Sequence, residues 1–222
     1  MSATVLILAK APVPGQAKTR LCPPATPGQA ARIAAASLLD TLDAARGRRT
    51  VVALAGSLAG AERRAEVRAA LAHCRVVPQR GATFAARLVA AHADAAYTDA
   101  GGSGPVIQLG MDTPQLGPAL LDEAGCALGS CDAVLGPACD GGWWALGVHD
   151  PRQARVLAGV PMSTRDTGAL TLRALRAAGL RVTLLPELSD VDTMEDAERV
   201  AEAIPGSRFA AAVAQVHPAV HR

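Results

Sequence analysis

Short apolar runs alternate with longer amphipathic segments along almost the whole chain. The apolar runs predict strands at Thr4–Lys10, Thr50–Ala55, Arg75–Pro78, Pro105–Gly110, Ala133–Gly136, Trp143–Val148 and Arg181–Leu185. The amphipathic segments predict helices from Pro27 to about Gly47 and near residues 60–72, 83–97, 116–128, 166–178 and 194–204. This alternation is typical of an α/β fold with a mostly parallel central sheet and helices on both faces. We expect one domain over residues 1–204 and a weakly patterned, loosely packed tail over residues 205–222.

Composition excludes several classes of protein. The 222 residues carry a net charge of +2 with acids and bases interspersed, which argues against a nucleic-acid partner. No apolar run approaches the ~20 residues that a membrane span requires. Five cysteines without a C-x-x-C pair argue against a disulfide framework and a zinc site. We therefore expect a cytoplasmic protein.

The loops after the strands are the expected location of the chemistry, because ligands of open α/β sheets bind beyond the carboxyl ends of the strands. The first loop, from Lys10 to Arg20, contains three cations and Gly15. It includes Lys10 and Lys18, the only two lysines of a chain with 20 arginines. The loop matches neither a Walker motif nor a dinucleotide-binding motif. We interpret it as a phosphate-binding loop; the alternative is a proline-stiffened connector with solvated basic side chains.

Acidic residues follow two other predicted strands. Asp112 ends the strand near residues 105–110, where a carboxylate is suited to hold a divalent cation or to cap the next helix. Asp192 is likewise a candidate metal ligand, or the N-cap of a capping box with Glu195. Asp190 does not fit that cap, which favours a further role for this acid.

The run Asp140-Gly141-Gly142-Trp143-Trp144 follows another strand. Strand alternation predicts Trp144 on the core face with Leu146 and Val148, and Trp143 on the other face as a wall of a cleft. Burial of both tryptophans in the core is the alternative. The two glycines permit close approach of a ligand to the backbone, or simply form a turn.

Taken together, five segments resemble a bacterial family of transferases. They are AKAPVPGQAKTRL, PQRG with AARL, LGMDTPQL, DAVLGPACDGGWWALG and LSDVDTMEDAERV, and the match runs from about Val5 to Val200. The family is selenodomain-associated transferase 1. The resemblance implies a Rossmann-like GT-A (nucleotide-diphospho-sugar transferase) fold. It also implies kinship with phospholactate guanylyltransferase, the molybdenum-cofactor nucleotidyltransferases and the cytidylyltransferases.

The resemblance also implies roles for individual residues. The family's nucleotide-phosphate loop corresponds to Lys10, Gly15, Lys18, Thr19 and Arg20, and a segment near the base corresponds to Gln79 and Gly81. Metal-binding acids correspond to Asp112 and Asp192. The chain departs from the family at Gln115, where an acid or Ser is common, at Ala86, where Glu is usual, and at Trp143-Trp144, where a Tyr pair is commoner. These departures affect the acceptor side rather than the phosphate and metal sites.

The first functional hypothesis is a metal-dependent glycosyltransferase that uses a nucleotide-diphospho-sugar and a small-molecule acceptor. In it, Lys10, Lys18 and Arg20 neutralise phosphates, with Lys18 and Arg20 also counted as catalytic, and Asp140 accepts the acceptor's proton. Asp112 and Asp192, with Asp190 as a further candidate, hold Mg²⁺ or Mn²⁺, and Gly141, Gly142 and Trp143 form the acceptor pocket. The second hypothesis is nucleotidyl transfer from an NTP to a small phosphorylated acceptor. The third is a nucleotide-binding module without turnover.

Overall fold

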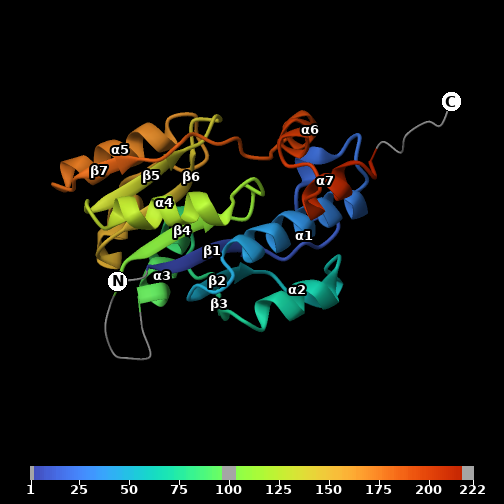
Figure 1. The fold of residues 1–222 in the computed structure, drawn as a ribbon, viewed down its shortest axis with the longest axis horizontal. Helices are drawn as coiled ribbons and strands as arrows, with labels where there is room; N and C mark the ends of the chain where they lie inside the picture. The colour runs from blue at the N-terminus through green and yellow to red at the C-terminus, as the bar shows by residue number, and fades with distance from the viewer. Residues whose placement is uncertain (1–2, 97–103, 217–222) are drawn as a thin grey trace.

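The computed structural model describes residues 3–96 and 104–216. A seven-stranded sheet forms its centre (Figure 1). The strands are β1 Thr4–Lys10, β2 Thr50–Ala55, β3 Arg75–Pro78, β4 Val106–Gly110, β5 Ala133–Pro137, β6 Trp143–Val148 and β7 Val182–Leu184. Their order is β3-β2-β1-β4-β6-β5-β7, and β6 runs antiparallel to its neighbours while the other pairs are parallel. The predicted α/β fold with a mostly parallel sheet is confirmed.

Helices cover both faces of the sheet. They are α1 Pro27–Ala44, α2 Arg64–Leu71, α3 Phe84–Ala96, α4 Pro118–Leu128, α5 Thr167–Ala177, α6 Met194–Ala203 and α7 Arg208–Val213. Short 3₁₀ helices add Thr19–Leu21, Leu58–Gly60 and Pro151–Gly159. The helices expected from the amphipathic segments all exist, with ends that differ by a few residues; residue 97 lies outside the described residues. The 3₁₀ helix Pro151–Gly159 was not predicted.

Two apolar layers sandwich the sheet because its central strands are buried on both faces. In β1, Val5, Ile7 and Ala9 pack with α1, α2 and α4, whereas Leu6 and Leu8 pack with α3, α5 and the 3₁₀ helix Pro151–Gly159. This alternation is what a period-two backbone imposes. A strand without a polar face has to lie inside such a sandwich, which explains the uninterrupted apolar run.

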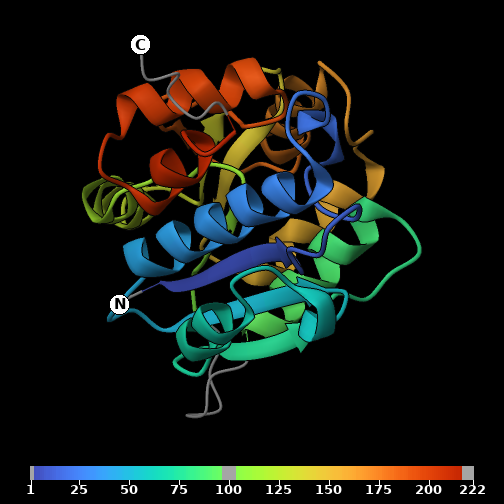
Figure 2. The same cartoon turned by 90° about the vertical axis from the view of Figure 1, so that its right-hand side faces the viewer.

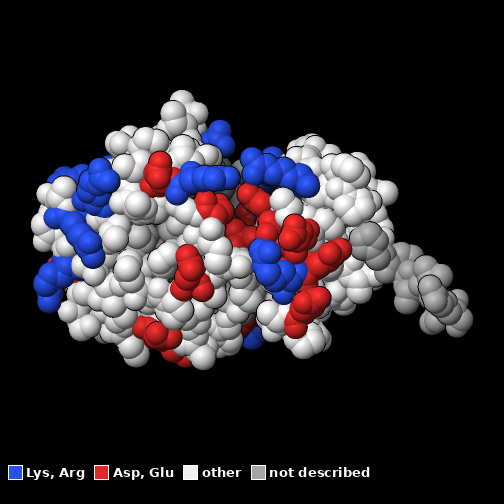
Figure 3. Space-filling model, turned by 90° about the horizontal axis from the view of Figure 1, so that it is seen from above, with Lys and Arg blue, Asp and Glu red and all other residues white. Residues whose placement is uncertain are grey.

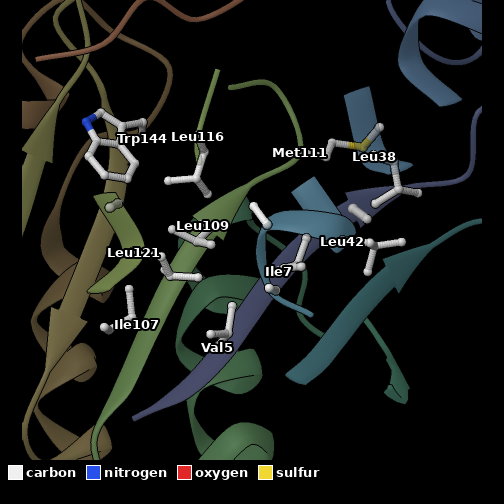
Figure 4. Packing of buried hydrophobic residues seen from close by; sticks show 14 of the residues in the cluster. Val5, Ile7, Leu38, Leu42, Ile107, Leu109, Met111, Leu116, Leu121 and Trp144 are labelled. Atoms are coloured by element: carbon white, nitrogen blue, oxygen red, sulfur yellow. The ribbon is translucent and has the colours of Figure 1, made fainter. Parts of the chain in front are cut away.

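Trp144 departs from the predicted alternation. It packs with Leu109 and Leu116 in the cluster on the α1 side (Figure 4), whereas Leu146 and Val148 belong to the opposite cluster. The pairing of β5 with β6 shifts register between Gly136 and Pro137, opposite the start of β6. Such a bulge places consecutive side chains out of alternation, so the prediction that Trp144 shares a face with Leu146 and Val148 is wrong.

The prediction of a loosely packed segment after Pro205 is wrong for its first part. Helix α7 lies with α6 along the outer side of α1 (Figure 2). Phe209 is fully buried there in a third cluster with Ile33 of α1 and Val200 of α6. A single short apolar face, Phe209 with Ala212 and Val213, is enough to dock the helix. Residues 217–222 lie outside the described residues.

Candidate functional site

The carboxyl ends of the parallel strands meet at one edge of the sheet, and the loops that follow them surround a cleft of about 930 Å³. Most of the predicted site residues line it: Lys10, Lys18, Thr19, Arg20, Gln79, Asp112, Asp140, Gly142, Trp143, Asp190 and Asp192. On the face shown in Figure 3, acidic side chains gather near the centre and basic side chains border them. A smaller hollow of about 500 Å³ lies between α6 and α7, away from these loops.

Lys18 and Asp112 form the innermost ion pair of the cleft. The Lys18 Nζ lies 2.8 Å from the Asp112 Oδ1, and the lysine side chain is only 10% exposed. The same ammonium donates a hydrogen bond to the carbonyl oxygen of Val191. The loops after β1, β4 and β7 therefore converge on one lysine.

Further contacts hold the last of these loops in place. Arg20 Nη1 donates to the Asp192 Oδ2 at 2.9 Å, and the Val191 N–H donates to the Asp112 carbonyl oxygen at 3.1 Å. The amide of Gln115, one of the departures from the family, donates from Nε2 to the carbonyl oxygen of Ser189 at 2.6 Å. Asp190 and Asp192 are thereby fixed beside Asp112.

Neither Asp112 nor Asp192 is a helix cap. Helix α4 begins after Gly117 without a side-chain cap, and α6 is capped by Thr193 in a capping box with Asp196. Pro27 opens α1 after a capping box formed by Thr26 and Gln29, as predicted. The capping box expected at Asp192 and Glu195 is wrong by one residue, because Thr193 and Asp196 satisfy the same pattern. Neither carboxylate is therefore needed to cap a helix; Asp112 pairs with Lys18 and Asp192 with Arg20.

Asp190 carries the clearest electrostatic signature of the cleft. Burial, together with the nearby charges of Asp112 and Asp140, raises the pKa of Asp190 to about 7, while Lys18 opposes the shift. A surplus of negative charge of this kind is relieved by a cation. Carboxylate oxygens are the donors that Mg²⁺ and Mn²⁺ prefer, so the residues present fit a divalent ion. Within residues 3–96 and 104–216, however, no three ligating side chains already converge on one point.

Three predicted glycines do not line the cleft, and backbone geometry explains each of them. Gly15 has φ +72° with no atom near its missing Cβ, so it serves the turn itself. A Cβ on Gly81 would lie 2.9 Å from the backbone of Ala86, and one on Gly141 would lie 2.0 Å from the Arg165 carbonyl oxygen. Gly81 and Gly141 therefore permit close packing of the chain on α3 and before α5, and their contact with a ligand stays a prediction.

Gln79 and Asp140 lie in the cleft with part of their hydrogen-bonding capacity used. The Gln79 Nε2 donates to the carbonyl oxygens of Ala9 and Ala53, both at 3.0 Å, which ties β1 to β2. The Asp140 Oδ1 accepts from the Gly142 N–H at 2.7 Å. Trp143 is half-buried and lines the cleft, as predicted, but it packs against the cluster of Leu146 and Val148 and not on the opposite face. Of the two tryptophans, only Trp144 is fully buried in the core.

One wall of the cleft lies outside the predicted loops and is formed by Met162, Ser163, Thr164, Arg165 and Thr167. This segment does not directly follow a predicted strand, so the expectation that ligands bind beyond the carboxyl ends of strands does not include it. The Gly168 N–H donates to the Gly141 carbonyl oxygen at 2.8 Å and holds the segment against the Asp140–Gly142 turn. The sequence feature that could have indicated this wall is the run of Ser163, Thr164 and Arg165 before the predicted helix near residues 166–178.

A buried imidazole lies beneath the cleft. His92 of α3 is fully buried beside Gln108, a residue of the cleft floor, and neither ring nitrogen has a hydrogen-bond partner among the described residues. Burial lowers the pKa of His92 from 6.5 to about 4, against a smaller opposing effect of the Gln108 side chain.

This shift predicts a specific acid sensitivity. Between pH 6.5 and about 4 the unfolded chain binds a proton at His92 that the native protein does not bind, so stability falls as the pH falls. The full effect is on the order of 3 kcal/mol. Urea denaturation from pH 7 to pH 4.5 should show a smaller loss for His92→Gln than for the wild type. The raised pKa of Asp190 makes stability rise as the pH falls, but it does so equally in the wild type and in His92→Gln. The difference between the two proteins therefore reports His92 alone. Equal losses of stability in both would contradict the lowered pKa of His92.

Within the described ranges, none of the helices combines the length and the hydrophobicity that crossing a bilayer requires.

Solved structures share this fold over nearly the whole chain. A protein of Desulfovibrio desulfuricans, provisionally assigned as a nucleotide-diphospho-sugar transferase, is 26% identical, with a TM-score of 0.82 over 97% of this chain and 99% of that one. The Mycobacterium tuberculosis protein Rv0371c, solved with manganese, is 20% identical, with a TM-score of 0.54 over 92% of this chain and 100% of that one. The 2-C-methyl-D-erythritol 4-phosphate cytidylyltransferase of Thermus thermophilus is 17% identical, with a TM-score of 0.51 over 97% of this chain and 99% of that one. The last two likenesses show the fold alone.

No protein of curated function matches the sequence significantly. The sequence model of one family, described as an uncharacterized protein conserved in bacteria (DUF2064), matches residues 38–164. Since this match covers more than half of the chain, the protein is a member of the DUF2064 family.

Proposed function

We propose that this protein is a metal-dependent transferase that uses a nucleotide-activated donor, and that the donor is a nucleotide-diphospho-sugar. The observation that carries the proposal is the convergence of Lys18, Asp112 and Asp190 from three strand-end loops in one cleft. Cations and carboxylates side by side suit a diphosphate with its divalent ion. The 26% identical structure supports the same donor class.

The cations bind the donor phosphates in this proposal. Lys10, Lys18 and Arg20 line the cleft, and Thr19 lies between two of them. Asp112, Asp190 and Asp192 would hold Mg²⁺ or Mn²⁺, which when bound offsets the charge that develops on the leaving diphosphate. The manganese in the structure of Rv0371c is consistent with this cofactor. Gln79 is the remaining candidate near the base.

Asp140 is the proposed proton acceptor. Its hydrogen bond from the Gly142 N–H orients the carboxylate toward solvent in the cleft, beside Trp143. During glycosyl transfer, an acceptor hydroxyl oxygen bonds to the anomeric carbon, the bond from that carbon to the diphosphate breaks, and the hydroxyl proton passes to Asp140. The acceptor would lie between Gly142, Trp143 and the Ser163–Thr167 segment.

Nucleotidyl transfer from an NTP to a small phosphorylated acceptor is the second candidate, because the fold is also that of a cytidylyltransferase. Nucleotide binding without turnover is the third. Incubation with Mn²⁺ and a set of nucleotide sugars and NTPs separates them. Release of a nucleoside diphosphate from a nucleotide sugar supports glycosyl transfer, and pyrophosphate release from an NTP supports nucleotidyl transfer. Binding without either product supports the third.

A thermal-shift screen of UDP-, GDP-, dTDP- and CDP-sugars and NTPs, with and without Mn²⁺, identifies the nucleotide first. A ligand at 100 times its dissociation constant stabilises the protein by about 2.7 kcal/mol. No shift with any of these compounds would overturn the proposed function.

Three further assignments complete the proposal. We place the protein in the selenodomain-associated transferase 1 group on its sequence motifs. The transferase occupies residues 1–204, and α7 supports it from outside. We propose the reducing cytoplasm as its compartment, because its five cysteines are all unpaired thiols.

The two neighbouring acids should separate by role. Asp192→Ser leaves the Thr193 cap of α6 intact and removes an exposed ion pair with Arg20, so stability should change by less than about 1 kcal/mol. If Asp192 is a ligand, the Mn²⁺ concentration that gives half-maximal activity should rise about tenfold or more. Glu195→Gln, in the first turn of α6 and outside the cleft, is the control and should change neither the stability nor the metal dependence. Unchanged metal dependence in Asp192→Ser with a rise only in Asp190→Asn would move the ligand assignment to Asp190.

A further inference from the structure

The Lys18 ammonium is paired with Asp112, one of the proposed metal ligands. Its Nζ lies 2.8 Å from the Asp112 Oδ1 and bonds to the carbonyl oxygen of Val191, with only 10% of the side chain exposed. Arg20 differs: it reaches Asp192 from outside, and its side chain is 76% exposed. Lys18 is thus the cation inside the acidic cluster rather than at its rim.

The carboxylates around Lys18 interact with one another. Asp190 lies close enough to Asp112, Asp140 and Asp192 for their negative charges to act on it, and Lys18 acts in the opposite direction. An isolated carboxylate cluster of this kind would attract a divalent cation from solution. Here the ammonium already supplies part of the compensating charge.

A free metal ion and the ammonium compete for the same oxygen. A Mg²⁺ ion needs a carboxylate oxygen at about 2.0–2.1 Å, and an ammonium hydrogen-bonded to that oxygen competes for it and repels the ion. Lysine is suited to change partners, because its charge is compact and its stem is flexible.

A diphosphate removes this obstacle. It offers Lys18 several anionic oxygens in place of one carboxylate, and release of Asp112 opens the metal position. We propose, building on the proposed function, that the protein takes up its divalent ion only as a metal–nucleotide complex, and that Lys18 excludes the free ion. Lys18 then has two roles with opposite signs: it strengthens the binding of phosphate and weakens the binding of metal alone.

Two titrations test this role, because replacing Lys18 should change the affinities for Mn²⁺ and for pyrophosphate in opposite directions. Lys18→Met keeps the length of the side chain and removes its charge. In calorimetric titrations with Mn²⁺ alone, the variant should bind about tenfold or more tightly than the wild type. With inorganic pyrophosphate alone, which probes the phosphate subsite whatever the base, the variant should bind about tenfold more weakly.

Lys10→Met is the matched control, because it removes the same charge from the same cleft. No carboxylate of the described residues lies within ion-pair distance of Lys10. This variant should change Mn²⁺ affinity by less than about threefold. Lys18→Arg should not restore wild-type behaviour in both titrations, since the planar guanidinium does not fit the same space. Thermal denaturation verifies that each variant is folded.

The outcomes of these titrations separate this inference from the proposed function. Unchanged or weaker Mn²⁺ binding by Lys18→Met would overturn the exclusion role, as would an equal gain in Lys10→Met. If the nucleotide found in the screen still binds with Mn²⁺, the proposed function survives that failure. If the wild type binds neither the nucleotide nor pyrophosphate, the proposed function itself fails.

Discussion

Asp112→Asn should abolish metal-dependent nucleotide binding and leave the fold intact. The residue lies at the carboxyl end of a buried central strand and carries the oxygen that Lys18 bonds at 2.8 Å. Asparagine keeps the shape of the side chain but removes the negative charge that a divalent ion requires. Loss of a direct ligand should weaken binding of the metal–nucleotide complex by about 100-fold or more, since even supporting residues around a metal contribute 10–100-fold.

The fold should tolerate this change. Asp112 does not cap α4, its side chain is 45% exposed, and Asp190 remains close enough to the buried Lys18 ammonium to offset its charge, so the protein should stay folded. Asp122→Asn is a suitable control, because Asp122 pairs with Arg48 on the surface and does not line the cleft. Calorimetry with the nucleotide chosen by the thermal-shift screen, with and without Mn²⁺, measures the effect. Wild-type Mn²⁺ dependence in Asp112→Asn would remove Asp112 from the site.

Gly141→Ala should be among the most damaging single-methyl changes in the chain. The added Cβ would lie 2.0 Å from the Arg165 carbonyl oxygen, and the backbone φ of +87° already disfavours any side chain. Overlap with backbone and positive φ together should lower the free energy of unfolding by about 3 kcal/mol or more. Because this turn positions Asp140 and Trp143, the activity should fall as well.

Gly15→Ala is the comparison that isolates the overlap. Gly15 also has a positive φ, +72°, but no atom lies within 4 Å of the position of its missing Cβ. Only the conformational cost remains, about 1 kcal/mol. Urea denaturation followed by tryptophan fluorescence reports both values, since the only two tryptophans follow Gly141 closely. Equal costs at the two positions would show that the turn relaxes and that Arg165 does not restrain it.

Much of the fold could be predicted because the apolar runs of the central strands are buried on both faces. Between Thr4 and Lys10, β1 has no polar residue, so its sequence excludes an exposed sheet and requires covering helices. The edge that carries the cleft follows from the same logic, since parallel strands end together. The acids and cations in the loops after the strands could therefore be predicted as candidate site residues.

What the sequence does not contain is the pairing between distant loops. Nothing in the pattern indicates that Lys18 bonds to Asp112 and Val191, because these contacts depend on the packing of three strands. The cap of α6 was misplaced because Asp192 and Thr193 are equally good cap residues and each is followed by an acid three positions later. The packing of Trp144 depends on a bulge, which leaves no trace in a period-two pattern.

The contact between Lys18 and Val191 has a consequence for how the protein is made. Its two residues lie 173 positions apart, so the cleft requires two segments that are distant in the sequence. A ribosome delivers the loop that contains Lys18 well before the loop that contains Val191, and domains fold as their segments become available. The growing chain therefore has no complete cleft until the segment around Val191 has been synthesised.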